Sequence, residues 1–151
     1  NDRVDVALAL GRDGVHLPQA GLPAAEARRL LGPHRLVGVS CHALAEAREA
    51  EAGGADFITF GPVYDTPSKQ AYGPPVGLAA LRAARPEVHL PIFALGGVSA
   101  ARVPETLAAG ADGVAVISAV IAAADPAGAA GGLLAAVQRA RDEARLIRKS
   151  G

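Results

Sequence analysis

Residues 110–116 read Gly110-Ala111-Asp112-Gly113-Val114-Ala115-Val116, and the same phrase occurs at two earlier places in the chain. The earlier copies are Gly11-Arg12-Asp13-Gly14-Val15-His16-Leu17 and Gly54-Ala55-Asp56-Phe57-Ile58-Thr59. This self-similarity is an internal repeat. Each copy follows an Ala- or Leu-rich stretch, opens on a glycine suited to the left-handed end of a helix, and runs into β-forming residues. The phrase therefore predicts three joints at which a helix passes into a strand.

Two further apolar runs, at residues 35–40 and 91–96, bring the number of predicted strands to five. The segments between the strands have the composition of helices, over residues 4–10, 24–31, 43–52, 77–84, 100–109 and 127–147. Alternating strands and helices indicate a parallel α/β fold. Because a TIM barrel has eight strands and typically ~200 residues or more, the chain of 151 residues is either an open sheet or part of a barrel.

The composition narrows the class of partner. Fifteen basic and fifteen acidic residues give a formal net charge of zero, which does not favour nucleic acid. A single cysteine, Cys41, excludes an intramolecular disulfide, and the longest apolar stretch, residues 113–124, is too short for a bilayer. With no targeting pattern at the amino-terminal end, we expect one domain over residues 1–151, a cytoplasmic location and a small-molecule partner.

Ligands of parallel α/β folds bind beyond the carboxyl ends of the strands, so the residues that follow each apolar run are the candidates for a site. These segments are polar or glycine-rich in this chain, at residues 1–3, 16–19, 40–42, 61–69, 96–98 and 117–119. We therefore expect a binding site at this edge of the sheet.

A phosphate site is predicted after the last two strands. Gly96 and Gly97 follow one strand and Ile117 and Ser118 follow the next, which would bring bare backbone amides and a hydroxyl together. The alternative is that the two glycines only permit a tight turn between strand and helix.

The segment of residues 61–75 is longer than most joints between strand and helix, and long loops in compact domains are commonly functional. Lys69 offers a cation to an anionic ligand, and Thr66 and Ser68 offer two hydroxyls. The alternative is a surface loop with a solvated lysine.

The histidines do not predict a metal centre. His16 lies on a predicted strand, where a packed histidine with a satisfied hydrogen bond is the more common role than a catalyst. His42 stands beside Cys41, but zinc needs three or four convergent ligands, and the usual spacing is absent.

Six segments in order resemble the thiamine phosphate synthase/TenI family, namely residues 1–7, 13–17, 39–42, 61–69, 96–97 and 116–118. The resemblance implies a parallel (β/α)8 TIM barrel. It also implies that this chain covers the barrel from about the end of strand three to helix eight, so that residues 1–151 are a partial barrel domain.

Members of this family work in thiamine biosynthesis as transferases, which join hydroxymethylpyrimidine pyrophosphate to thiazole phosphate and release pyrophosphate. The resemblance places Asn1, Asp2, Ser40 and Lys69 on the pyrophosphate and Mg²⁺ side, with Asp2 as the metal ligand and Lys69 and Ser40 as catalytic residues. It places Thr66, Ser68, Gly97, Ile117 and Ser118 on the thiazole phosphate side. It also allows a homodimer, while the charge balance and the short apolar stretch described above predict neither nucleic acid nor membrane as a partner.

Two departures from the family pattern leave alternatives open. The position of a second acidic Mg²⁺ ligand is Gly21 in this chain. Residues 17–23 are similar to the TenI branch, whose members tautomerise a thiazole carboxylate phosphate with a histidine at the position of Pro62. The alternatives to the synthase are therefore a thiazole tautomerase and a non-catalytic barrel that binds a phosphorylated ligand.

Overall fold

The computed structural model describes residues 1–66 and 74–149, and it contains five parallel strands. They are β1 (Gly14–Leu17), β2 (Leu36–Cys41), β3 (Phe57–Phe60), β4 (Ile92–Leu95) and β5 (Gly113–Ala115). Each strand pairs with the next one along the chain, in the order β1-β2-β3-β4-β5. The predicted parallel α/β fold with five strands is confirmed.

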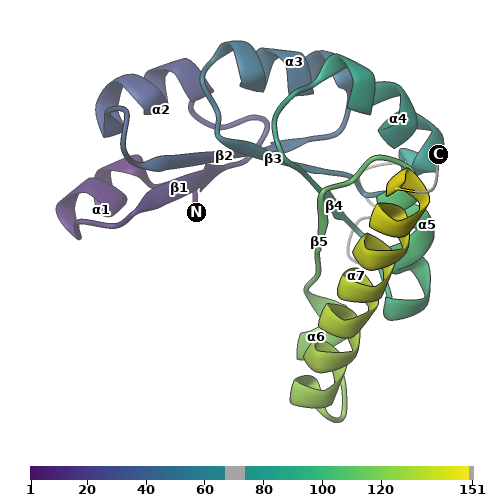
Figure 1. Cartoon of the computed structure of the whole chain (residues 1–151). Helices are drawn as coiled ribbons and strands as arrows, with labels where there is room; N and C mark the ends of the chain where they lie inside the picture. Colours follow the sequence, from purple (N-terminus) through teal and green to yellow (C-terminus); the bar gives the residue numbers. More distant parts are fainter. Residues whose placement is uncertain (67–73, 150–151) are drawn as a thin grey trace.

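Helices cover the convex side of a strongly curved sheet and leave the concave side open (Figure 1). They are α1 (Val4–Ala9), α2 (Ala24–Leu31), α3 (Leu44–Ala52), α4 (Gly77–Ala84), α5 (Val103–Ala108), α6 (Ser118–Ile121) and α7 (Pro126–Lys149). Curvature of this kind, with helices outside, is the arrangement of an incomplete barrel. No helix of the described residues is long and apolar enough to span a membrane.

The glycines of the repeat adopt the predicted left-handed conformation, with φ of +60° at Gly11, +79° at Gly54 and +110° at Gly110. The acid of the repeat also has a structural role in two copies. Asp56 accepts a hydrogen bond from the backbone N–H of Val37 at 2.6 Å, and Asp112 accepts one from Ile92 at 2.8 Å. The repeated phrase therefore ties each new strand to the start of the strand before it.

Side chains alternate between the two faces of the sheet, as strand geometry requires. Buried apolar residues such as Leu17, Ile58 and Phe60 pack under the helices. The residues between them, including His16 and Thr59, are only partly buried and lie on the concave side. The open face of the sheet is therefore polar as well as aromatic.

Two helical segments differ from the sequence expectation. The helix predicted over residues 100–109 is a 3₁₀ turn, Ala100–Arg102, followed by α5. The short helix α6 was not predicted, because four residues are too few to show a helical period. The last helix, α7, begins after Asp125, whose Oδ1 accepts a hydrogen bond from the N–H of Gly128 at 3.0 Å.

Candidate functional site

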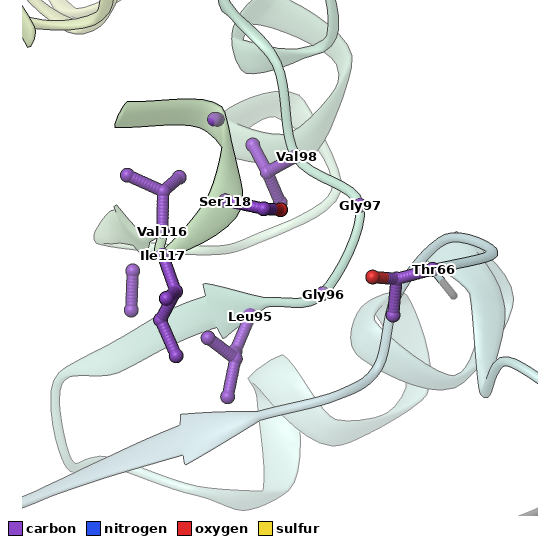
Figure 2. A pocket seen from close by; sticks show the side chains of 10 residues that line it. Thr66, Leu95, Gly96, Gly97, Val98, Val116, Ile117 and Ser118 are labelled. Carbon is purple, nitrogen blue, oxygen red and sulfur yellow. The ribbon is translucent and has the colours of Figure 1, made fainter. Parts of the chain in front are cut away.

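A pocket of about 70 Å³ lies at the carboxyl ends of β4 and β5. It brings together four residues of the predicted thiazole phosphate side, namely Thr66, Gly97, Ile117 and Ser118. Figure 2 shows the hydroxyls of Thr66 and Ser118 facing the Gly96–Gly97 turn from opposite sides. The pocket is larger than one ordered water requires, so it has room for a small anion. Ser68 lies outside the described residues.

The two glycines allow the segment after β3 to pack directly on the turn. Gly97 has φ of +65°, and a Cβ there would lie 2.6 Å from the carbonyl oxygen of Asp65. Gly96 has φ of +94°, and its Cβ would lie 2.5 Å from the Cβ of Pro62. The two glycines therefore permit a tight turn and the close packing of the segment after β3 on it. A phosphate site at the same turn is compatible with this role and stays a prediction.

Backbone hydrogen bonds extend the pairing between the ends of β3 and β4. The N–H of Val63 donates to the carbonyl of Leu95 at 2.8 Å, and the N–H of Tyr64 donates to that of Gly96 at 3.1 Å. These bonds carry Thr66 to the rim of the pocket, where its side chain is buried. The segment after β3 thus continues the pairing with β4 as far as Tyr64.

Arg102 fixes the turn from outside, which the sequence did not reveal. Its Nη1 donates to the carbonyl of Gly97 at 2.7 Å, and its guanidinium lies 4.4 Å from the ring centroid of Tyr64. The hydroxyl of Tyr64 in turn donates to Glu105 at 2.8 Å. In a trans peptide the C=O and the next N–H point in opposite directions. By holding the carbonyl of Gly97, Arg102 therefore sets the direction of the following N–H, that of Val98.

We expect Arg102→Ala to weaken phosphate binding about threefold to tenfold, because one charge-assisted hydrogen bond and one cation–π contact are lost. Calorimetry with a phosphorylated thiazole on the whole protein measures this. Arg82→Ala, at an exposed position of α4, is the matched control and should leave affinity unchanged. Equal effects of the two variants would contradict a role for Arg102 at the turn.

Two residues predicted for the pyrophosphate side, Asp2 and Ser40, lie at the other end of the same edge. The N–H of Asp2 donates to the carbonyl of His16 at 2.8 Å, which places Asp2 at the carboxyl end of β1. Asp2 Oδ1 is 2.8 Å from the position that a Cβ on Gly21 would take. Gly21 and Ser40 line one pocket of about 120 Å³. Asn1 is exposed next to Asp2, and Lys69 lies outside the described residues.

Ser40 belongs to a small hydrogen-bonded cluster of side chains. His16 Nε2 lies 2.9 Å from Ser40 Oγ, and the hydroxyl of Thr59 donates to Ser40 Oγ at 3.4 Å. Burial lowers the pKa of His16 below its usual value, which favours the neutral ring. The prediction of a packed histidine with a satisfied hydrogen bond is confirmed, although its partner was not foreseen.

The two ends of the edge are continuous. A smaller pocket of about 30 Å³ is lined by Ser40 and Thr59 on one side and by Pro62 and Gly96 on the other. Beside it, burial raises the pKa of the Cys41 thiol to about 12, so Cys41 stays protonated and is a poor nucleophile. Pockets that share lining residues therefore follow the carboxyl edge from β1 to β5, and Glu46 and Glu49 also line the one beside Ser40.

The acidic side chain at this edge, that of Asp2, suits a Mg²⁺ ion shared with substrate phosphates better than an ion enclosed by protein ligands. Among the described residues, no group of three or more His, Cys, Asp or Glu side chains could hold a metal ion. Mg²⁺ commonly keeps several waters and is held by one or two carboxylates together with substrate phosphates. Asp2, at the open carboxyl edge and beside Gly21, fits that smaller requirement.

Comparison with known proteins gives concordant matches. The family model described as thiamine monophosphate synthase matches residues 1–120. A putative thiamine-phosphate synthase of Geobacter sulfurreducens is 62% identical over 144 residues, which are 95% of this chain and 68% of that protein. A thiamine-phosphate synthase of Moorella thermoacetica is 51% identical over 141 residues, which are 93% of this chain and 67% of that protein.

Solved structures agree with the sequence comparisons. The thiamine phosphate pyrophosphorylase from Pyrococcus furiosus superposes with a TM-score of 0.82 at 39% identity, over 92% of this chain and 66% of that one. A 3-hexulose-6-phosphate synthase superposes with a TM-score of 0.67 at 31% identity, over 89% of this chain and 67% of that one. The chain thus spans about two thirds of the length of these relatives.

Proposed function

Because the chain belongs to the thiamine monophosphate synthase family, a family of transferases in thiamine biosynthesis, we propose that the whole protein joins hydroxymethylpyrimidine pyrophosphate to thiazole phosphate. Pyrophosphate is the leaving group. The observation that carries the proposal is the pocket that holds Thr66, Gly97, Ile117 and Ser118, at the same edge of the sheet as Asp2 and Ser40.

The thiazole phosphate is assigned to the pocket at β4 and β5. Its oxygens would accept hydrogen bonds from backbone amides of the turn at Gly97 and of the Ile117–Ser118 segment, and from the hydroxyls of Thr66 and Ser118. The side chain of Ile117 is 70% exposed, so its contribution is assigned to the backbone. Ser68, from outside the described residues, is assigned to the same phosphate.

The pyrophosphate is assigned to the end of the edge near β1 and β2. Asn1 and the hydroxyl of Ser40 would donate hydrogen bonds to it, and Lys69, from outside the described residues, would add a positive charge. Asp2 would hold Mg²⁺, which supplies Lewis-acid stabilisation of the leaving group when it is bound. Because the charge that develops is on the leaving group, these residues act electrostatically and need not transfer a proton.

The test is turnover of the whole protein with both substrates. We expect thiamine phosphate and pyrophosphate to form in equal amounts. If the protein instead tautomerises a thiazole carboxylate phosphate, the tautomerase alternative replaces the synthase. If it binds phosphorylated thiazole without converting either substrate, the non-catalytic alternative replaces both.

Ser118→Ala should weaken the binding of thiazole phosphate only about fivefold, because it removes one hydrogen bond of about 1 kcal/mol and leaves the backbone amides in place. Calorimetry of the whole protein measures the change. Ser99→Ala is a close control, since Ser99 is exposed just after the same turn and makes no side-chain cap hydrogen bond. A loss of a hundredfold or more, as expected for Gly97→Val, would contradict the assignment of the phosphate to the backbone amides.

A further inference from the structure

Three polar side chains on the concave face meet immediately below the pyrophosphate end of the edge. His16 Nε2 lies 2.9 Å from Ser40 Oγ and 3.5 Å from Thr59 Oγ1. They come from neighbouring strands, where Ser40 pairs with Thr59 and His16 pairs with Gly38. His16 therefore approaches Ser40 from the side of Gly38, two residues before Ser40 on β2. Ser40 itself lines two pockets at the carboxyl edge.

The imidazole of His16 has a fixed place. A Cβ on Gly38 would lie 2.6 Å from His16 Nδ1 and 2.3 Å from the Phe57 ring, so the ring depends on the absence of a side chain there. The rings of His16 and Phe57 have centroids 5.7 Å apart, and Phe93 meets Phe57 edge-on at the same distance. The contact with Phe57 holds the imidazole where its Nε2 faces Ser40 Oγ.

The direction of this hydrogen bond decides what Ser40 can offer a ligand. A serine hydroxyl has one proton to donate and two lone pairs to accept with. If Nε2 of His16 accepts the hydrogen bond, the only hydroxyl proton of Ser40 points at His16 and away from a ligand in the pocket. If Nε2 donates, as Thr59 does at 3.4 Å, the proton of Ser40 is left for the pocket. An anionic oxygen can only accept a hydrogen bond, so only the second arrangement lets Ser40 bind it.

We propose that His16 is a positioning residue, which carries its proton on Nε2 and donates it to Ser40, so that Ser40 donates its own proton to an anionic oxygen of pyrophosphate. His16 itself does not contact the ligand. The inference rests on the proposed function, which places pyrophosphate beside Ser40.

The tautomer can be measured directly. Nitrogen-15 NMR of the whole protein at neutral pH should show the ring of His16 protonated at Nε2 and unprotonated at Nδ1. The opposite tautomer would overturn the inference. This readout needs neither a ligand nor turnover.

Binding of inorganic pyrophosphate with Mg²⁺, followed by calorimetry, tests the coupling. Ser40→Ala should weaken binding about tenfold or more, and His16→Leu should cause a similar loss. The double variant should lose no more than Ser40→Ala alone, because His16 acts on the ligand only through the hydroxyl of Ser40. His16→Gln, whose amide N–H can replace Nε2–H, should stay within about threefold of the parent.

Phe93→Leu is the matched control, because Phe93 packs edge-on against Phe57 from β4, two strands away from Ser40 on β2. It should lower Tm and leave pyrophosphate affinity unchanged, which separates loss of packing from loss of the hydrogen bond. Additive losses for His16→Leu and Ser40→Ala, no rescue by His16→Gln, or no effect of Ser40→Ala would each overturn the inference. The proposed function fails separately, through absent turnover in the parent protein.

Discussion

Gly97→Val is expected to reduce the affinity of the whole protein for thiazole phosphate by a hundredfold or more in calorimetry. A non-glycine residue at φ of +65° costs about 1–2 kcal/mol. A Cβ there would also lie 2.6 Å from the carbonyl oxygen of Asp65 and 2.8 Å from the Cβ of Tyr64. Because backbone atoms cannot move aside cheaply, the turn and the loop should separate, and the wall of the pocket that carries Thr66 should be lost.

Gly11→Val separates this effect from backbone strain alone. Gly11 has nearly the same φ, +60°, but nothing lies within 4 Å of the position of its Cβ. It belongs to the joint between α1 and β1, at the far end of the sheet from the pocket. We expect Gly11→Val to lower Tm while thiazole phosphate affinity stays close to that of the parent. Similar affinity losses in both variants, or none in either, would contradict a phosphate site at Gly97.

The architecture could be predicted because its signals are local. The repeated phrase marks each joint with a glycine in a conformation that other residues disfavour, and φ is positive at Gly11, Gly54 and Gly110. Strand bounds followed the apolar runs closely, as with β3 at Phe57–Phe60. In a parallel sheet, the order of strands then brings all carboxyl ends to one edge, which predicted a site there. The family resemblance, and not the strand order, assigned Thr66 and Ser118 to the same phosphate.

Contacts that depend on strand register or on the exact shape of a turn could not be predicted in the same way. The hydrogen bond between His16 and Ser40 depends on the register of β1 and β2 and on the missing side chain of Gly38. Arg102 looks like an ordinary solvated arginine until the turn places the carbonyl of Gly97 beside it. Both contacts follow from geometry that no local pattern records.

Lys69→Ala is expected to reduce turnover of the whole protein by roughly a hundredfold or more, the scale of losing one electrostatic contact in the transition state. Lys69 lies outside the described residues, so its role rests on the sequence, where it follows Thr66 and Ser68. A lysine side chain ordinarily carries a positive charge at neutral pH, so we expect Lys69 to act as a fixed charge and not as a base. Lys69→Arg should therefore retain part of the rate, since the charge remains while its geometry changes.

Steady-state kinetics with both substrates measure these variants, and Lys149→Ala, at the end of α7, is a control that removes the other lysine of the sequence. Lys149→Ala should leave kcat unchanged. Gly21 offers no carboxylate beside Asp2, so charge neutralisation of the leaving group should depend more heavily on Lys69 than it would with two acidic metal ligands. An unchanged kcat in Lys69→Ala would remove Lys69 from the mechanism, because no other effect of the substitution would restore a missing charge at the leaving group.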